Sequence, residues 1–240
     1  MEFLQKLRLL IVVRVVACLA APSGRNDAVN DAPTIINRMS TLVDPVDALL
    51  VIDMQNSFCH PDGVMYDAVG TPMFEIDETV KATAAAVAAA RTAKIPVVFT
   101  RHQYRAGHAD FGPLFPQFRD LLQAQQGLLA GSWDADVIDE LEFSPRDLVV
   151  DKARLDAFFN TSLDTLLHSM GVTRIAAAGV LTNACVETSV RAAAMRDYNV
   201  TVLSDCTTSG QEQHRAMSLE CLEAYHIASV RPFSADLFAQ

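Results

Sequence analysis

The chain has 240 residues, 50% of them hydrophobic and 20% charged, and a formal net charge of −10 at pH 7. This length and apolar content suffice for one large domain, or two small ones, with a substantial core, and they exclude a mainly disordered chain. The acidic excess argues against a nucleic-acid partner, because binding to phosphates needs a cationic surface. The five cysteines show no C-x-x-C spacing, which argues against a disulfide framework or a zinc knuckle and favours a reducing compartment.

Residues 1–45 are expected to form an N-terminal extension outside the main domain. Its apolar run Leu9–Ala21 follows Lys6 and Arg8 and is similar to the core of an export signal. Arg14 interrupts this run, which is also too short to span a bilayer. We therefore predict no membrane span and a cytoplasmic location, with export through a working signal as the alternative.

From residue 46 to residue 240, short apolar runs alternate with longer helical stretches. In chain order, the pattern predicts a strand at 48–52, a helix at 76–93, strands at 97–99 and 148–150, a helix at 162–169, a strand at 175–180, a helix at 184–196, a strand at 200–203, a helix at 211–225 and a strand at 227–230. Such alternation predicts one three-layer α/β/α domain with a mostly parallel sheet of about six strands. The polar stretch 101–142 is too long for a plain connection and predicts a functional excursion.

Three chemically reactive side chains follow predicted strands. Asp53 comes directly after the first strand, Lys152 follows the third, and Cys185 stands after the fourth at the start of a predicted helix. Ligands of parallel α/β sheets bind beyond the carboxyl ends of the strands, so we expect these residues to converge on one edge.

Cys185 has physical reasons to be nucleophilic. A helix N-terminus and the nearby Lys152 both favour the thiolate, and a carboxylate could take the thiol proton and return it to a leaving group. The alternative is that Cys185 is a small buried apolar residue, which leaves a lysine after a buried strand unexplained. The same structural role is expected for Cys59, in a predicted loop, and for Cys206 and Cys221.

Three motifs, in this order along the chain, resemble the isochorismatase-like cysteine hydrolases. They are Val51-Ile52-Asp53-Met54-Gln55-Asn56-Ser57-Phe58, Asp151-Lys152, and Gly179-Val180-Leu181-Thr182-Asn183-Ala184-Cys185-Val186-Glu187-Thr188. The similarity extends from about residue 48 to residue 230. Within it, residues 131–134 and 159–164 are most similar to the ureidoacrylate amidohydrolase and biuret hydrolase branch.

The resemblance implies an amidohydrolase that cleaves a C–N bond of a small amide, ureido or N-carbamoyl compound through a thioester, releasing ammonia or an amine. It makes Cys185 the nucleophile, Asp53 its proton acceptor and later donor, and Lys152 the cation that stabilises both. It also implies a non-proline cis peptide bond before Leu181 and an oxyanion hole formed by the N–H groups of Leu181 and Cys185.

The resemblance also bears on substrate and metal binding. Phe58 matches an aromatic residue of the family's pocket, with a place in the core as the alternative. A substrate carboxylate could be bound, unless the residues are merely solvated, by Arg101, His102, Tyr104 and Arg105. Nicotinamidases of the family carry an Asp-x-His metal site, and because residues 100–104 lack this aspartate we predict no metal and no cofactor.

Two other functions stay open. One is a nicotinamidase-like or isochorismatase-type hydrolase, although isochorismatases lack the cysteine that is present here as Cys185. The other is a non-catalytic member that binds a small molecule in the same crevice, for which loss of the Asp–Lys–Cys set would be the sign. The family further implies a homo-oligomer whose ligand is a small-molecule substrate.

Overall fold

The computed structural model describes residues 45–69, 72–143 and 147–239. The predicted N-terminal extension therefore lies, except for residue 45, outside the described residues, and its boundary with the main domain stays a prediction. Six parallel strands form one sheet in the order β3-β2-β1-β4-β5-β6. The strands are β1 (Ala48–Ile52), β2 (Val97–His102), β3 (Leu148–Lys152), β4 (Arg174–Val180), β5 (Asn199–Thr208) and β6 (Ser229–Arg231).

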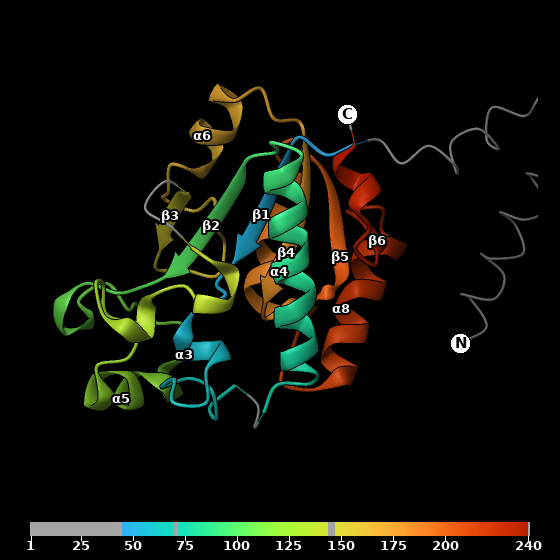
Figure 1. Cartoon of the computed structure of the whole chain (residues 1–240). Coiled ribbons are helices and arrows are strands. Elements are labelled where there is room, and N and C mark those ends of the chain that lie inside the picture. Colours follow the sequence, from blue (N-terminus) through green and yellow to red (C-terminus); the bar gives the residue numbers. More distant parts are fainter. Residues whose placement is uncertain (1–44, 70–71, 144–146, 240) are drawn as a thin grey trace, which may run out of the picture. The chain divides into compact units, whose positions relative to one another are not determined.

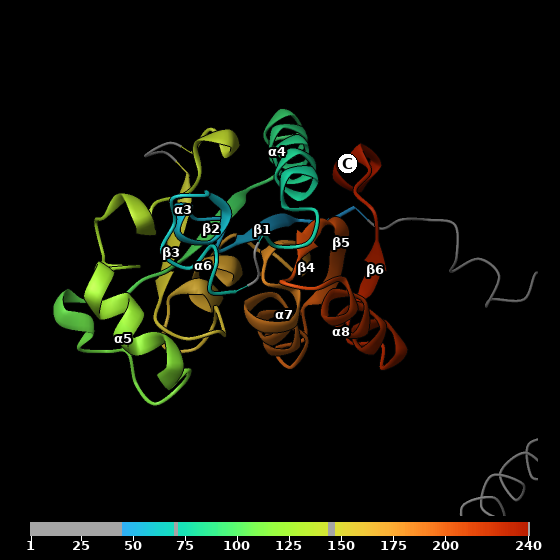
Figure 2. The ribbon, with the colours of Figure 1, turned by 90° about the horizontal axis from the view of Figure 1, so that it is seen from below.

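Helices cover both faces of this sheet, which confirms the predicted three-layer α/β fold (Figures 1 and 2). One face packs against α4 (Ile76–Thr92) and the short C-terminal turn Ala235–Phe238. The other face packs against α6 (Leu163–Ser169), α7 (Glu187–Ala194) and α8 (Glu212–Ala224). No helix among the described residues is long and apolar enough to cross a bilayer.

The central strand β1 explains why the apolar run at 48–52 is unbroken. Leu49 and Val51 belong to the core under α4, whereas Leu50 and Ile52 belong to the core on the opposite face. All four are buried, and each buried aliphatic side chain contributes about 1.5–3 kcal/mol relative to an exposed one. Alternate side chains therefore supply both layers at once, as is typical of a parallel strand covered on both sides.

The structure differs from the predicted elements mainly at their ends. Strand β2 continues through Arg101 and His102, because these polar residues pair with Asp151 and Lys152 of β3. The excursion contains α5 (Pro116–Gln125) and several short turns. Cys59 ends the short helix α3 (Asn56–Cys59) instead of lying in a loop, and the helix expected from residue 184 is preceded by a π-helical turn, Thr182–Val186.

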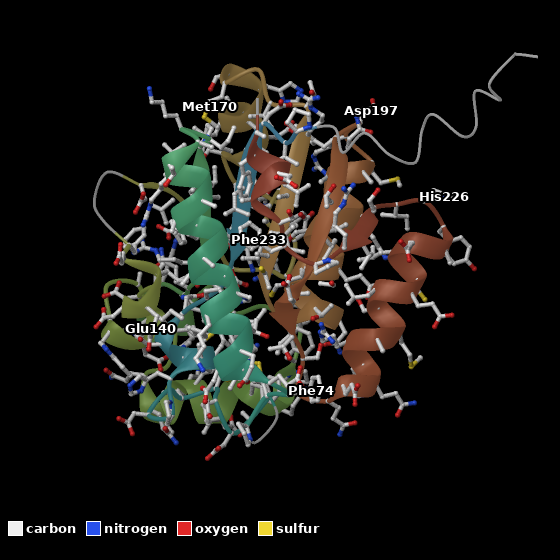
Figure 3. The ribbon with its side chains drawn as sticks, turned by 45° about the vertical axis from the view of Figure 1, so that its right-hand side comes forward. Phe74, Glu140, Met170, Asp197, His226 and Phe233 are labelled. Carbon is white, nitrogen blue, oxygen red and sulfur yellow. The ribbon has the colours of Figure 1, made fainter. Side chains whose placement is uncertain are left out.

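The order of the strands places a crevice at the carboxyl ends of β1 and β4. From β1 the chain proceeds through β2 and β3 to one edge of the sheet, and from β4 through β5 and β6 to the other. Such a reversal opens a ligand-binding crevice beyond the two central strands. Figure 3 shows Phe74 at this end of the sheet, whereas Met170 and Asp197, which follow α6 and α7, lie at the opposite end.

Gly179 allows β1 and β4 to approach each other at this crevice. It pairs with Ile52 where the register of β4 with β5 shifts, and its φ is 120°. A Cβ at this position would lie 2.0 Å from the Ile52 carbonyl oxygen. Neither strand can accommodate that contact without moving, and Asp53 follows Ile52 directly.

We therefore expect Gly179→Ala to lower the free energy of unfolding by at least about 3 kcal/mol, because the clash adds to an unfavourable φ. Urea denaturation followed by circular dichroism measures this change. Gly171→Ala is the matched control, since Gly171 also has a positive φ, 71°, but nothing lies within 4 Å of its added Cβ. A similar loss in both variants would show that backbone conformation, not the approach of the strands, sets the cost.

Candidate active site

The structure brings Asp53, Lys152 and Cys185 together at the carboxyl ends of the strands. Asp53 follows β1, Lys152 is the last residue of β3, and Cys185 lies in the π-helical turn after β4. Lys152 Nζ donates to Asp53 Oδ2 at 2.6 Å and to Cys185 Sγ at 3.4 Å. A carboxylate oxygen of Asp53 also lies within 4.8 Å of Cys185 Sγ. An acid, a cation and a thiol thus share one small space.

The hydrogen bonds of Lys152 explain how an ammonium is tolerated there. Its side chain is 0% exposed and that of Asp53 is 1% exposed. A third bond, to the carbonyl oxygen of Arg154 at 2.9 Å, gives each of the three ammonium hydrogens an acceptor. Burial lowers the pKa of Lys152, but Asp53 and Cys185 more than offset this and hold that pKa above its ordinary value. Lys152 is therefore a permanent cation.

The thiol of Cys185 is protonated at neutral pH. Burial raises its pKa above the ordinary value, Lys152 opposes this, and Asp53 adds to it. This differs from the expectation that a helix start and a lysine would favour a resting thiolate. The desolvation of a residue that is only 6% exposed outweighs both influences, so nucleophilic attack requires a base that removes the proton.

Two residues that sequence reasoning missed hold Asp53 in place. Thr100 Oγ1 donates to Asp53 Oδ1 at 2.6 Å, and the Asp53 N–H donates to the Thr100 carbonyl at 3.2 Å. The Gln55 amide donates to the carbonyls of His102 and Ala135 and accepts the His102 N–H. These bonds join the ends of β1 and β2. The sequence does offer one signal for Thr100, because this residue places a hydroxyl directly after the apolar residues with which β2 begins.

The backbone after β4 carries an N–H group that makes no hydrogen bond among the described residues. The peptide bond between Val180 and Leu181 is cis, as the family resemblance predicts. The Leu181 carbonyl accepts the N–H groups of Ala184 and Val186. No acceptor among the described residues lies within hydrogen-bonding distance of the Leu181 N–H. That N–H is therefore available to a ligand.

A pocket of about 460 Å³ lies against Lys152. Of the residues predicted to bind substrate, Tyr104 lines it, as does Arg105. Cys185 is not among its lining residues, but its Sγ lies 3.4 Å from Nζ of Lys152, which is. The described residues that line the pocket are Gln103, Tyr104, Arg105, Asp110, Ala130, Asp151, Lys152, Ala153, Arg154, Phe159 and Asn160.

The other predicted substrate-binding residues lie elsewhere. Phe58 is 8% exposed and packs in the core under α4, the alternative noted for it. Arg101 Nε donates to Asp151 Oδ1 at 2.8 Å, and its Nη1 lies 3.6 Å from Asp136 Oδ1. His102 is buried below Tyr104, whose hydroxyl lies 2.8 Å from His102 Nε2.

Sequence reasoning missed Arg154, a half-buried residue of the pocket wall. Its Nη1 donates to the carbonyls of Asp110 at 2.8 Å and Phe111 at 3.4 Å, so it ties the excursion to the loop after β3. No partner of its Nε or Nη2 occurs among the described residues. Its position two residues after Lys152 was the only local signal.

Asp53, His102 and Cys185 are also the described residues that could together hold a metal ion, since one ligand atom of each lies within 4.8 Å of the others. The Lys152 ammonium, however, already bonds to Asp53 and Cys185. A divalent cation would have to displace this charge from a buried site, so the cluster fits a cation poorly.

Comparison with known proteins places these residues in context. Residues 47–230 match the isochorismatase domain family. The chain belongs to the isochorismatase family.

Its relatives include the ureidoacrylate amidohydrolase RutB of Methylobacterium radiotolerans, which is 34% identical over 203 residues, covering 79% of this chain and 78% of that protein. The protein of the same name from Pantoea ananatis is 35% identical over 203 residues, covering 78% and 80%. The crystal structure of a cysteine hydrolase from Pseudomonas syringae pv. phaseolicola aligns with a TM-score of 0.68 at 30% identity, covering 80% of this chain and 90% of that one. These findings confirm the family that the three motifs predict.

The buried His102 should make this family member sensitive to acid. The pKa of His102 is lowered from 6.5 to about 3, mainly by burial and secondly by the positive charge of Lys152. Between these values the unfolded chain binds more protons than the folded one, so the free energy of unfolding falls as pH falls, by up to about 1.4 kcal/mol per pH unit. His102→Gln should flatten this decline below about pH 6. Urea denaturation at a series of pH values measures it.

His214→Gln, which changes an exposed histidine of α8, is the control for loss of one imidazole. If the free energy of unfolding of His102→Gln falls with decreasing pH as steeply as that of the wild type, His102 is not the cause of this acid sensitivity.

Alkylation should reveal which groups control the Cys185 proton. Only the thiolate reacts, so iodoacetamide should modify Cys185 faster as pH rises from about 7 to about 10. Asp53→Asn removes a carboxylate that raises the pKa of the thiol. We expect alkylation at a fixed pH to accelerate by roughly threefold to tenfold in this variant, since one pKa unit corresponds to about tenfold more thiolate.

Peptide mass spectrometry over time measures each rate separately, and the exposed Cys221 serves as the internal control. Unchanged or slower alkylation of Cys185 in Asp53→Asn would mean that Asp53 does not stabilise the thiol proton.

Proposed function

We propose that the chain is a cysteine-dependent amidohydrolase that cleaves a C–N bond of a small amide, ureido or N-carbamoyl compound. The observation that carries this proposal is the buried cluster in which Lys152 bonds to both Asp53 and Cys185 beside a pocket. The two relatives named ureidoacrylate amidohydrolase support the same class of reaction. No metal or cofactor is required by the steps below.

In the first half of the reaction, Asp53 accepts the Cys185 proton and the sulfur attacks the substrate carbonyl carbon. The carbonyl oxygen becomes an oxyanion, and the N–H groups of Leu181 and Cys185 stabilise it. Each such donor is worth about 3 kcal/mol of barrier. Asp53 then gives its proton to the leaving nitrogen, the C–N bond breaks, and an acyl thioester of Cys185 remains.

In the second half, Asp53 accepts a proton from water while the water oxygen attacks the thioester carbon. The C–S bond breaks, and the sulfur leaves as a thiolate beside Lys152. Asp53 returns the proton to it, which restores the starting state. The same carboxylate therefore serves twice as a base and twice as an acid.

The pocket wall favours a substrate that carries a carboxylate. Arg105 has an 85% exposed side chain and only a distant partner, Asp110, at 3.8 Å. Arg154 Nη1 is engaged with backbone carbonyls, whereas its Nε and Nη2 have no partner among the described residues. A guanidinium binds a carboxylate through paired hydrogen bonds, and ureidoacrylate, named for two relatives, is such an acid. We therefore assign carboxylate binding to Arg105 and Arg154.

The proposal also covers the cellular compartment and the oligomeric state of the protein. The cysteines that the structure describes, Cys59, Cys185, Cys206 and Cys221, are all free, which supports a reducing compartment and hence a cytoplasmic enzyme. A homo-oligomer without a nucleic-acid partner remains our expectation, and light scattering of the purified protein measures the oligomeric state.

Ammonia release from ureidoacrylate, biuret, N-carbamoyl amino acids, nicotinamide and simple amides tests the proposal. We expect the ureido acids to be hydrolysed with a kcat/KM at least about tenfold above that of their neutral amide analogues, which cannot pair with a guanidinium. Cys185→Ala should lower kcat by at least about a thousandfold, because the nucleophile is lost.

Cys221→Ala, which removes an exposed cysteine outside the site, is the matched control and should keep the wild-type rate. Near-complete activity of Cys185→Ala would exclude the thioester mechanism. Preference for nicotinamide would favour the nicotinamidase-like alternative, and tight binding without turnover would favour the non-catalytic one.

A further inference from the structure

A buried hydroxyl of α8 lies against the turn that carries Cys185 and against the residue that follows it. Ser218 Oγ lies 3.2 Å from the Thr182 carbonyl oxygen and 2.6 Å from Glu187 Oε2. Thr182 begins the five-residue π-helical turn, and Glu187 follows it directly. Ser218 is 4% exposed and Thr182 is 0% exposed, whereas the Glu187 side chain is 23% exposed.

The turn is also attached to its other neighbours. The Glu187 N–H donates to the carbonyls of Thr182 and Ala184. Thr182 Oγ1 lies 2.8 Å from Thr207 Oγ1 of β5. The Thr182 carbonyl therefore accepts the N–H of Glu187 and lies beside Ser218 Oγ of α8, while the Thr182 side chain contacts the sheet.

Glu187 is fixed in a position from which it can accept the Ser218 proton. Arg191 Nε donates to Glu187 Oε1 at 2.9 Å, and Ser218 lies at the other carboxylate oxygen. Hydrogen bonds to a carboxylate are short and roughly twice as strong as those between neutral groups. Ser218 thus links α8 to a residue that α7 has already immobilised.

We propose that Ser218, acting with Glu187, is a positioning residue that sets where the Leu181 and Cys185 N–H groups point. This inference rests on the proposed amidohydrolase function. A π-helical turn is rare and occurs frequently at functional sites, and its wide hydrogen-bonding pattern gives it less internal support than an α-helix has. Donors to an oxyanion must be held within about 0.5 Å of their working positions, so support from outside the turn has a direct catalytic consequence.

Packing alone does not account for a serine at this position. The other buried residues of α8, Leu219 and Leu222, are apolar and belong to the core on that face of the sheet. An alanine would fill the space of Ser218 almost as well. What only a hydroxyl supplies is a single donor, which the nearer acceptor, the carboxylate of Glu187 at 2.6 Å, takes.

Kinetics of Ser218→Ala test the proposal with the best ureido or amide substrate. We expect kcat to fall by roughly tenfold to a hundredfold, because small displacements of catalytic groups have effects of this size, while KM changes by less than about threefold. Ser218→Thr keeps the hydroxyl and should restore at least about half of the wild-type kcat.

Thr83→Val is the matched control for loss of a buried hydroxyl. Thr83 Oγ1 donates to the Cys206 carbonyl at 3.3 Å from α4, on the opposite face of the sheet. This variant should lose stability to a similar extent, as measured by thermal unfolding, but keep its kcat. A wild-type kcat in Ser218→Ala, an equal loss in Thr83→Val, or no rescue by Ser218→Thr would overturn the inference.

A substrate-free measurement separates this inference from the proposed function. If the wild-type protein hydrolyses none of the compounds, the proposed function fails, and the iodoacetamide rate of Cys185 is compared instead. Ser218→Ala should change that rate by at least about threefold, whereas Thr83→Val should not, because only the former displaces the turn. Equal rates in all three proteins would show that Ser218 does not position the thiol.

Discussion

The buried ammonium of Lys152 is the constraint on which the rest of the site depends. A charge removed from water is costly unless every hydrogen finds an acceptor, and here the acceptors come from separate segments: Asp53 after β1, Arg154 after β3 and Cys185 after β4. These segments can meet only if β1, β2, β3 and β4 are in register, which the pairs of Ile52 with Gly179 and of His102 with Lys152 provide. The condition for burying the charge and the condition for bringing Asp53, Lys152 and Cys185 together are therefore the same.

The same cation reconciles a protonated thiol with nucleophilic chemistry. In the proposed mechanism the proton passes from Cys185 to Asp53 and the negative charge moves from the carboxylate to the sulfur, and Lys152 already bonds to both side chains. The net charge of the buried cluster does not change, so no additional desolvation opposes the transfer. A thiol whose pKa is raised by burial is less reactive at neutral pH than an exposed low-pKa cysteine, which reacts with any electrophile.

The parts that could be predicted from the sequence are those set by short-range patterns. The apolar run of β1 and the regular helix α4 lie where expected, and Asp53, Lys152 and Cys185 stood out because each follows a buried strand. Long-range contacts decided the remainder. Arg101 lies within β2 because β3 pairs with it, and it bonds to Asp151 instead of facing the pocket. Likewise, the contribution of Arg154 to the pocket has no signature in the local sequence beyond its distance from Lys152, and the bond from Ser218 to Glu187 has none.

In the proposed enzyme, the residues that react and the residues that select the substrate come from different parts of the fold. Asp53 and Cys185 follow the central strands β1 and β4, and Lys152 ends the edge strand β3, whereas much of the pocket wall belongs to the excursion after β2. Arg154 fastens that wall to the segment next to Lys152, and the buried Asp134 accepts the N–H groups of Val64 and Leu128 within it. A change of residues such as Arg105 would alter the charge that meets the substrate without disturbing the bonds of Lys152. Selectivity can therefore vary while the buried cluster stays intact, which explains why one arrangement of strands can serve hydrolases with different substrates.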